Sequence, residues 1–355
     1  FRSARRIAAC AGRDEDVGPA GDRHVGPPLP GADADAGRQL VAAEDRAAPV
    51  RADDDQGAVH ARPGPLDDGL AIGLPAAPQV GRLELAARHD GIVVNADSMQ
   101  VYGDLRVLSA RPSEADEAAT EHRLYGHVSA ATRYSVGRWL ADIAPVLAEA
   151  RKARRLAIVV GGTGLYFKAL TEGLAAVPEI PGAVRSRILA EAESADTAQL
   201  HERLQAVDPE DAAVIRLSDR SRIIRALEVF EATGRSLADW NRAGASPPLV
   251  APEDAARMVL VPDRAELHRR IAERAGRMMR GGARGEVERL MAQGLGSSLP
   301  AMKAIGVREL CDHIAGSISL EEATAAIATE TRRYARRQLT WFRNQMQDWP
   351  SVDPG

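Results

Sequence analysis

The chain has few of the residues that mark several large classes of protein. Its 355 residues include only two cysteines, Cys10 and Cys311, which excludes a disulfide framework and a cysteine-rich zinc site. No apolar run approaches the roughly 18 residues of a membrane-spanning helix, and the first residues lack the basic, apolar and small-residue order of a secretory signal. These absences predict a cytoplasmic protein with no membrane partner.

The chain also lacks an excess of charge of one sign. Its net charge is −4, and the first 80 residues account for all of it, with nine arginines and no lysine against 13 carboxylates. The remainder carries 37 basic and 37 acidic residues. Bulk charge therefore favours no partner, and an RNA-binding function must rest on local clusters of arginine and lysine.

The first 80 residues contain no Lys, Asn, Thr, Tyr, Trp or Met, and Ala, Gly, Pro, Arg and Asp dominate them. Neither a helical nor a strand period is present. One interpretation is a low-complexity, disordered extension. The other is an out-of-frame translation of GC-rich DNA, because the missing residues mostly have codons that contain A or T. We leave both open and treat residues 1–82 as unassigned.

The pattern changes from Leu83 onward, where short apolar strands alternate with helices. The end of a helix at residues 83–89 precedes a buried strand at residues 92–95. Further strands are predicted at residues 156–160 and 258–261, each followed by a helix. This alternation indicates an α/β fold with a parallel sheet, whose ligands bind beyond the carboxyl ends of the strands. The charged, strand-free residues 181–249 read as a helical insertion.

Two of these strand ends carry residues suited to chemistry. Asp97 follows the first strand, where its carboxylate can accept a proton from a ligand or, alternatively, can cap the next helical turn. The second strand runs into Gly161-Gly162-Thr163-Gly164 and a helix. This turn either binds an anion at the helix start or uses its glycines only for their backbone angles.

Two of the predicted helices are rich in arginine. Arg270, Arg274 and Arg277 have helical spacing, so we expect them to share a face that is either solvated or binds a diphosphate or an RNA backbone. The last helix is predicted from a capping box at Ser319 to about Asn344, with five arginines among Tyr, Trp and Phe. Such mixtures suit looped RNA, although the aromatics could equally belong to the core.

The ordered segments NADSMQVY (95–102), VGGTGLYFKAL (160–170), SRIIRALEVF (221–230), HRRIAERAGRMM (268–279) and RRYARRQLTWFR (332–343) resemble the tRNA dimethylallyltransferase family. The resemblance covers about Leu83 to Trp349 and implies a P-loop NTPase-like α/β core with a helical insertion domain. It implies transfer of a dimethylallyl group from dimethylallyl diphosphate to the exocyclic amine of the adenosine 3′ of a tRNA anticodon, with Mg²⁺ assisting. We expect a monomer that binds the tRNA anticodon stem-loop.

The resemblance also assigns roles to residues. The general base falls on Asp97, and Arg270 and Arg274 are candidates for binding the diphosphate. The expected tRNA contacts are Asp97, Ser98, Met99, Gln100, Thr163, Arg185, Ser221, Arg222, Ile223, Ile224 and Arg225. In domain terms, residues 83–180 form the first part of the core, 181–249 the tRNA-contacting insertion, and 250–355 the second part with its Arg-rich helices.

One feature of the family is missing. Members carry a phosphate-binding loop, G-x-x-x-x-G-K-[ST], about ten residues before the segment LELAARH, and its amides, lysine and hydroxyl hold the diphosphate and Mg²⁺. Residues 71–82 here read AIGLPAAPQVGR, without lysine or hydroxyl, so the metal ligands are unknown. The chain as written is therefore expected to bind tRNA weakly and to be inactive as a transferase. The alternatives are a tRNA-binding pseudoenzyme and a prenyltransferase that acts on free adenine nucleotide.

Overall fold

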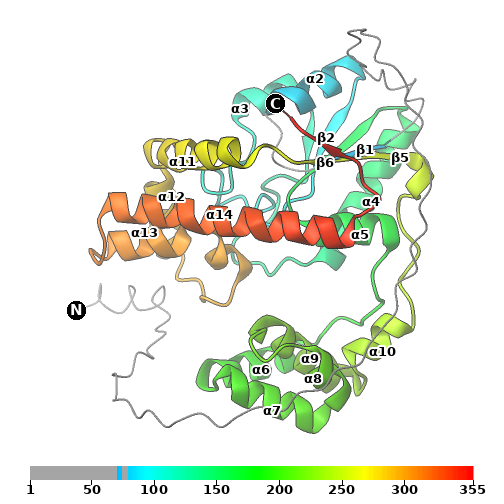
Figure 1. Cartoon of the computed structure of the whole chain (residues 1–355), viewed down its shortest axis with the longest axis vertical. Coiled ribbons are helices and arrows are strands. Elements are labelled where there is room, and N and C mark those ends of the chain that lie inside the picture. Colours follow the sequence, from blue (N-terminus) through cyan, green and yellow to red (C-terminus); the bar gives the residue numbers. More distant parts are fainter. Residues whose placement is uncertain (1–69, 74–78, 355) are drawn as a thin grey trace, which may run out of the picture. The chain divides into compact units, whose positions relative to one another are not determined.

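The protein was analysed as a computed structural model that describes residues 70–73 and 79–354. Its main sheet has five parallel strands in the order β3-β2-β4-β1-β5 (Figure 1). The strands are β1 (Leu70–Gly73), β2 (Ile92–Asn95), β3 (His122–Arg123), β4 (Ala157–Val160) and β5 (Ala255–Arg257). The parallel α/β architecture predicted from the sequence is confirmed.

Apolar, β-branched runs explain why β2 and β4 lie in the middle of this sheet. Every residue of both strands is buried. Alternate side chains of β2 face two different clusters, with Val94 in the cluster of helix α4 (Val136–Lys152) and Val93 in that of α2 (Gln79–Arg88). Asn95 and Gly73 both pair in register with Val160, so three strands end at one level. That level is where ligands are expected.

The strands differ from the sequence prediction in two places. Strand β1 lies inside the sheet, between β4 and β5, although we left its residues unassigned because the surrounding composition showed no strand period. The predicted strand at 258–261 is present as β6 (Val259–Leu260), but it pairs with β7 (Ser351–Val352) in a separate two-stranded sheet, whereas β5, just before it, joins the main sheet. The core therefore begins before residue 83, and the predictions for residues 1–69 and 74–78 lie outside the described residues.

Helices surround the sheet and connect its strands. Helix α4 packs on α5 (Gly164–Glu172), and its Trp139 and Ile143 are fully buried. The short α3 (Glu114–Ala119) begins at a capping box on Ser113. In the part of the chain that the structure describes, no helix is both long and apolar enough to cross a bilayer.

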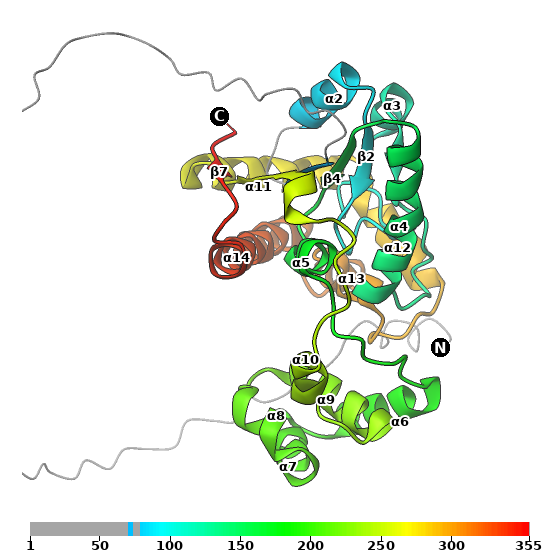
Figure 2. The same cartoon turned by 90° about the vertical axis from the view of Figure 1, so that its right-hand side faces the viewer.

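Residues 182–242 form a cluster of helices with a core of its own, coloured green in Figures 1 and 2. Its core is built on Ile188, Leu200, Leu204, Ile223 and Leu227, which are almost completely buried. Asp208 ends one helix and caps the next. The helices are α6 (Gly182–Ser194), α7 (Thr197–Val207), α8 (Pro209–Val214), α9 (Arg220–Thr233) and α10 (Leu237–Arg242).

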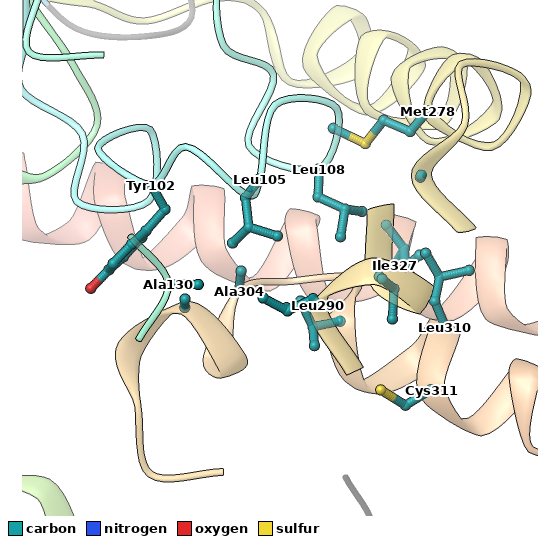
Figure 3. Close-up of a cluster of buried hydrophobic side chains, with 14 of the residues drawn as sticks. Tyr102, Leu105, Leu108, Ala130, Met278, Leu290, Ala304, Leu310, Cys311 and Ile327 are labelled. Carbon is teal, nitrogen blue, oxygen red and sulfur yellow. The ribbon is translucent and has the colours of Figure 1, made fainter. Parts of the chain in front are cut away.

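The remaining helices pack around the long helix α14 (Leu320–Gln345), which starts at the predicted capping box on Ser319. Helix α14 contacts α5, α11 and α13. Leu105 and Leu108, from the loop after β2, join these helices in one apolar cluster (Figure 3). The other elements are η1 (Pro252–Asp254), α11 (Arg264–Arg280), α12 (Ala283–Ala292), η2 (Pro300–Lys303) and α13 (Val307–Ile314).

Candidate active site

Asp97 lies two residues beyond the end of β2, in a turn that its own side chain holds. Its Oδ1 accepts hydrogen bonds from the backbone N–H groups of Met99 (2.8 Å) and Gln100 (3.3 Å). Asn95 supports the turn from below, because its Oδ1 accepts from the Asp97 N–H at 2.9 Å. The capping interpretation of Asp97 is thus correct for Oδ1. It does not compete with a chemical role, because a carboxylate has a second oxygen.

Opposing effects act on the pKa of the Asp97 carboxyl. Burial raises the pKa of its carboxyl above 3.8, while the backbone N–H groups of Met99, Gln100 and Gly162 and the charge of Arg274 lower it. Burial and the charge of Asp97 raise the pKa of both Tyr166 and Tyr334. Asp97 is therefore enclosed by one cation and two neutral phenols, a setting in which a carboxylate can serve as a base.

The glycine-rich turn after β4 lies directly against this segment. A Cβ on Gly161 would lie 2.0 Å from the backbone carbon of Ala96, so only glycine permits this approach. The Thr163 N–H donates to the Ala96 carbonyl at 3.2 Å, and its Oγ1 accepts from the Ser98 N–H at 2.9 Å. Two segments predicted separately from the sequence, at the ends of β2 and β4, thus meet through hydrogen bonds.

Helix α14 covers the other side of the turn. The Gln338 Nε2 donates to the Gly162 carbonyl at 2.7 Å. A Cβ on Gly164 would lie 2.2 Å from the Trp341 ring, so this glycine allows α14 to sit close to the start of α5. The sequence left open whether the aromatics of the last helix belong to the core or are available to RNA. Phe342 is buried in the core, whereas Trp341 is partly exposed.

The loop that follows Asp97 is held by buried polar side chains. The Gln100 Nε2 donates to the carbonyls of Ser109 (3.0 Å) and Ala110 (3.2 Å), so this predicted tRNA contact uses its amide within the protein. Glu286 on α12 is 3% exposed and accepts three backbone N–H groups, from Arg106, Val107 and Leu108, at 2.6 to 2.9 Å. Met99 packs against the apolar cluster beside this loop.

The three predicted arginines of α11 differ in their partners. Arg274 lies near Asp97, and its buried Nε has no hydrogen-bond partner among the described residues. Arg270 pairs with Glu266 at 2.5 Å, and the well-exposed Arg277 lies 3.8 Å from Glu273. The three arginines follow one another at i, i+4 and i+7 on a single helix, as predicted, but intrahelical carboxylates pair with two of them.

Residues predicted on the insertion have different environments. Ser221 and Arg222 are exposed and Ile224 is half-buried, but Ile223 is fully buried in the insertion core. The side chain of Ile223 therefore stabilises the fold and is not available to a ligand. Arg185 and Arg225 both approach the buried carboxylate of Glu228, at 3.6 and 3.5 Å.

A cavity of about 690 Å³ brings arginines from the insertion and from α14 together, and we call it the basic groove. Its lining contains five arginines and no carboxylate residue. Arg216 and Arg336 have no ion-pair partner among the residues that the structure describes, so their charge is available to an anion. The groove is lined by Arg216, Arg222, Arg333, Arg336, Arg337, Thr340, Trp341, Asn344 and Gln345.

Strand β1 is followed along the chain by helix α2, the strand-then-helix order that a phosphate-binding loop connects. Residues 73–82 contain no lysine, serine or threonine. In the described part of the chain, no three His, Cys, Asp or Glu side chains are grouped as metal ligands. These residues do not fit a phosphate-loop Mg²⁺ site, and we derive no step through a metal.

Sequence reasoning missed Gln338, Glu286 and Arg216. Gln338 stood within a quoted motif, but only the fold brings it to Gly162, 176 residues away. Glu286 on α12 and Arg216 in the connection between α8 and α9 carried no local signal, because a single charged residue usually faces solvent.

A family model described as IPP transferase matches residues 100–345. The tRNA dimethylallyltransferases of Azorhizobium caulinodans and Methylobacterium nodulans are 52% and 53% identical, over 77% of this chain and 87% and 90% of theirs. The crystal structure of the tRNA isopentenylpyrophosphate transferase from Bacillus halodurans is similar, with a TM-score of 0.56 and 30% identity over 81% of this chain and 90% of that chain.

Proposed function

Since the chain belongs to the tRNA dimethylallyltransferase family, we propose that it transfers a dimethylallyl group from dimethylallyl diphosphate to the exocyclic amine of the adenosine 3′ of a tRNA anticodon. The observation that carries the proposal is the basic groove. One of its lining residues, Trp341, contacts Gly164 of the turn beside Asp97. Phosphates of an RNA loop need the arginines, and a splayed base needs a flat ring.

The exocyclic amine is a poor nucleophile, because its lone pair is delocalised into the adenine ring. In the proposed step the amine nitrogen bonds to the allylic carbon, and the bond from that carbon to the diphosphate oxygen breaks with its electron pair. The proton of the amine goes to the Asp97 carboxylate. A partly desolvated carboxylate with a raised pKa is a better proton acceptor than one in water.

Negative charge develops on the departing diphosphate, and Arg270 and Arg274 are the proposed cations that receive it. Arg274 is the stronger candidate because its Nε is buried without a partner among the described residues. Arg270 must first loosen its ion pair with Glu266. Mg²⁺ would lower the cost of this charge when bound, but it stays a prediction of the resemblance. Action as a monomer is likewise only proposed.

The test measures transfer of radiolabel from dimethylallyl diphosphate to three acceptors: whole tRNA, an anticodon stem-loop and free adenine nucleotide. It uses the chain and a variant that combines Pro78→Gly, Gln79→Lys and Val80→Ser, which turns residues 73–80 into G-x-x-x-x-G-K-S. We expect label on tRNA and stem-loop only, with the larger rate in the variant.

Each alternative function has its own outcome. Salt-sensitive stem-loop binding without label in either protein would identify a binding protein that has no transferase activity. Label on free nucleotide but none on tRNA would identify a different acceptor. Absence of both binding and label would contradict the proposed function.

A further inference from the structure

We infer that Gln338 is a positioning residue for Asp97: its side chain fixes the glycine-rich turn against which the catalytic carboxylate rests. This inference rests on the proposed function, in which Asp97 takes the proton of the amine. Gln338 does not line the basic groove, and it is 241 residues from Asp97 in the sequence.

The peptide unit between Gly162 and Thr163 is held on both sides. Its carbonyl accepts from Gln338 Nε2 at 2.7 Å, and its N–H donates to the Ala96 carbonyl at 3.2 Å. Leaving a partly buried carbonyl without a hydrogen-bond donor costs free energy. The peptide unit therefore strongly prefers the orientation in which both hydrogen bonds form. The orientation also fixes where the Thr163 side chain points.

Two contacts lead from this peptide unit to Asp97. The Thr163 Oγ1 accepts from the Ser98 N–H at 2.9 Å and donates to the Ser98 Oγ at 3.2 Å, which holds the residue next to the base. The Gly162 N–H is also a hydrogen-bond partner that lowers the pKa of Asp97. Movement of the turn would therefore displace the carboxylate and remove one of its donors.

The charged and titratable groups that face Asp97 come from three other elements: Arg274 from α11, Tyr166 from α5 and Tyr334 from α14. Tyr334 is one helical turn before Gln338 on the same helix. Helix α14 thus supplies both a donor that fixes the turn and a phenol beside the base. Neighbouring residues of the same helix, among them Trp341, line the basic groove.

The experiment compares Gln338→Met, which keeps the side-chain length and removes the donor, with the matched control Gln293→Met. Gln293 donates to Asp104 Oδ1 at 2.7 Å, away from the turn. The rate at saturating RNA should fall about tenfold to a hundredfold in Gln338→Met, since small misplacement of a reacting group has effects of this size. The Kd for the stem-loop should change by less than about twofold, because the groove is intact. The control should keep both values.

A second measurement needs no transfer activity. Burial raises the pKa of Asp97 above 3.8, so the folded state retains its proton longer than the unfolded state and stability is lost as the pH rises. Loss of the Gly162 donor raises this pKa further. The urea midpoint of Gln338→Met should therefore fall further below that of the parent at pH 8 than at pH 4.5. This pH-dependent part should vanish when both proteins also carry Asp97→Asn.

A loss of midpoint that is equal at both pH values and persists with Asp97→Asn would make Gln338 purely structural and overturn the inference. An unchanged rate in a transferring protein would do the same. If the parent binds no stem-loop, the proposed function fails instead, and the pH comparison alone then decides whether Gln338 positions Asp97.

Discussion

At the carboxyl edge of the sheet, the segment proposed to bind the acceptor carries a complete set of polar side chains, whereas the segment expected to bind the donor does not. On the acceptor side, Asp97, Thr163 and the glycine-rich turn are joined by hydrogen bonds and backed by α14 and α12. On the donor side, the sequence between β1 and α2 stands where a phosphate-binding loop is expected from the order of elements, but it has none of that loop's lysine or hydroxyl residues. The order of strands and helices thus does not by itself create a phosphate-binding site, because the backbone topology does not supply the charged and hydroxyl side chains.

The largest effect should come from the acceptor side. Asp97→Asn, made in the variant that carries Gly-Lys-Ser at residues 78–80, should lower the transfer rate by about 10² to 10⁴-fold, the usual worth of a general base. Stem-loop affinity should be nearly unchanged. Single-turnover kinetics measure the rate, and Asp90→Asn, at an exposed residue before β2, is the matched control. Equal rates for Asp97→Asn and its parent would remove Asp97 from the mechanism.

On the donor side, restoring the loop should create a binding site. The combination of Pro78→Gly, Gln79→Lys and Val80→Ser should tighten binding of dimethylallyl diphosphate by about a hundredfold, because amide donors and a lysine then face the phosphates. Titration calorimetry measures the Kd. The same combination with Gln79→Met in place of Gln79→Lys should recover only part of the gain. If the unaltered chain bound dimethylallyl diphosphate as tightly as the variant, the missing loop residues would not be needed for donor-substrate binding.

The loop that follows Asp97 should be destabilised when the hydrogen bonds of the buried Glu286 are disturbed. Glu286→Gln replaces one acceptor oxygen with a donor that faces a backbone N–H, which should cost about 2 to 3 kcal/mol of unfolding free energy. Urea unfolding measures it. The neighbouring Glu288→Gln affects only a surface pair with Arg284 and should be nearly neutral. Similar losses for both variants would show that Glu286 has no special role in holding the loop.

The smallest effect concerns the groove. Arg216→Gln with Arg336→Gln should weaken stem-loop binding by about tenfold and lower the slope of log K against log salt by about 1.4, at about 0.7 per phosphate lost. Binding assays from 50 to 300 mM salt measure both quantities. Arg308→Gln, exposed on α13 and outside the groove lining, is the control. A weaker Kd with an unchanged slope would indicate that these arginines do not contact phosphate.

Much of the fold was predictable because its signals are local. The apolar runs of β2 and β4 and the capping box at Ser319 each depend on a few neighbouring residues. Strand β1 was not predictable in this way, because four residues in a segment poor in periodicity form a strand only when β4 and β5 flank them. The strand predicted at 258–261 does form, but the sequence could not show that it pairs with β7 while β5, just before it, pairs with β1.

For the candidate site, the sequence determined the residue types and their order, including Asp97, the glycine-rich turn, the arginine-rich helices and the missing Gly-Lys-Ser. The tertiary structure decided which of them meet. It placed Gln338 on Gly162 and Glu286 on the loop after Asp97, gathered Arg216 and Arg336 into one groove, and buried Ile223. Local patterns encode periodicity and capping over a few residues, whereas contacts between residues more than 100 positions apart depend on how whole elements pack.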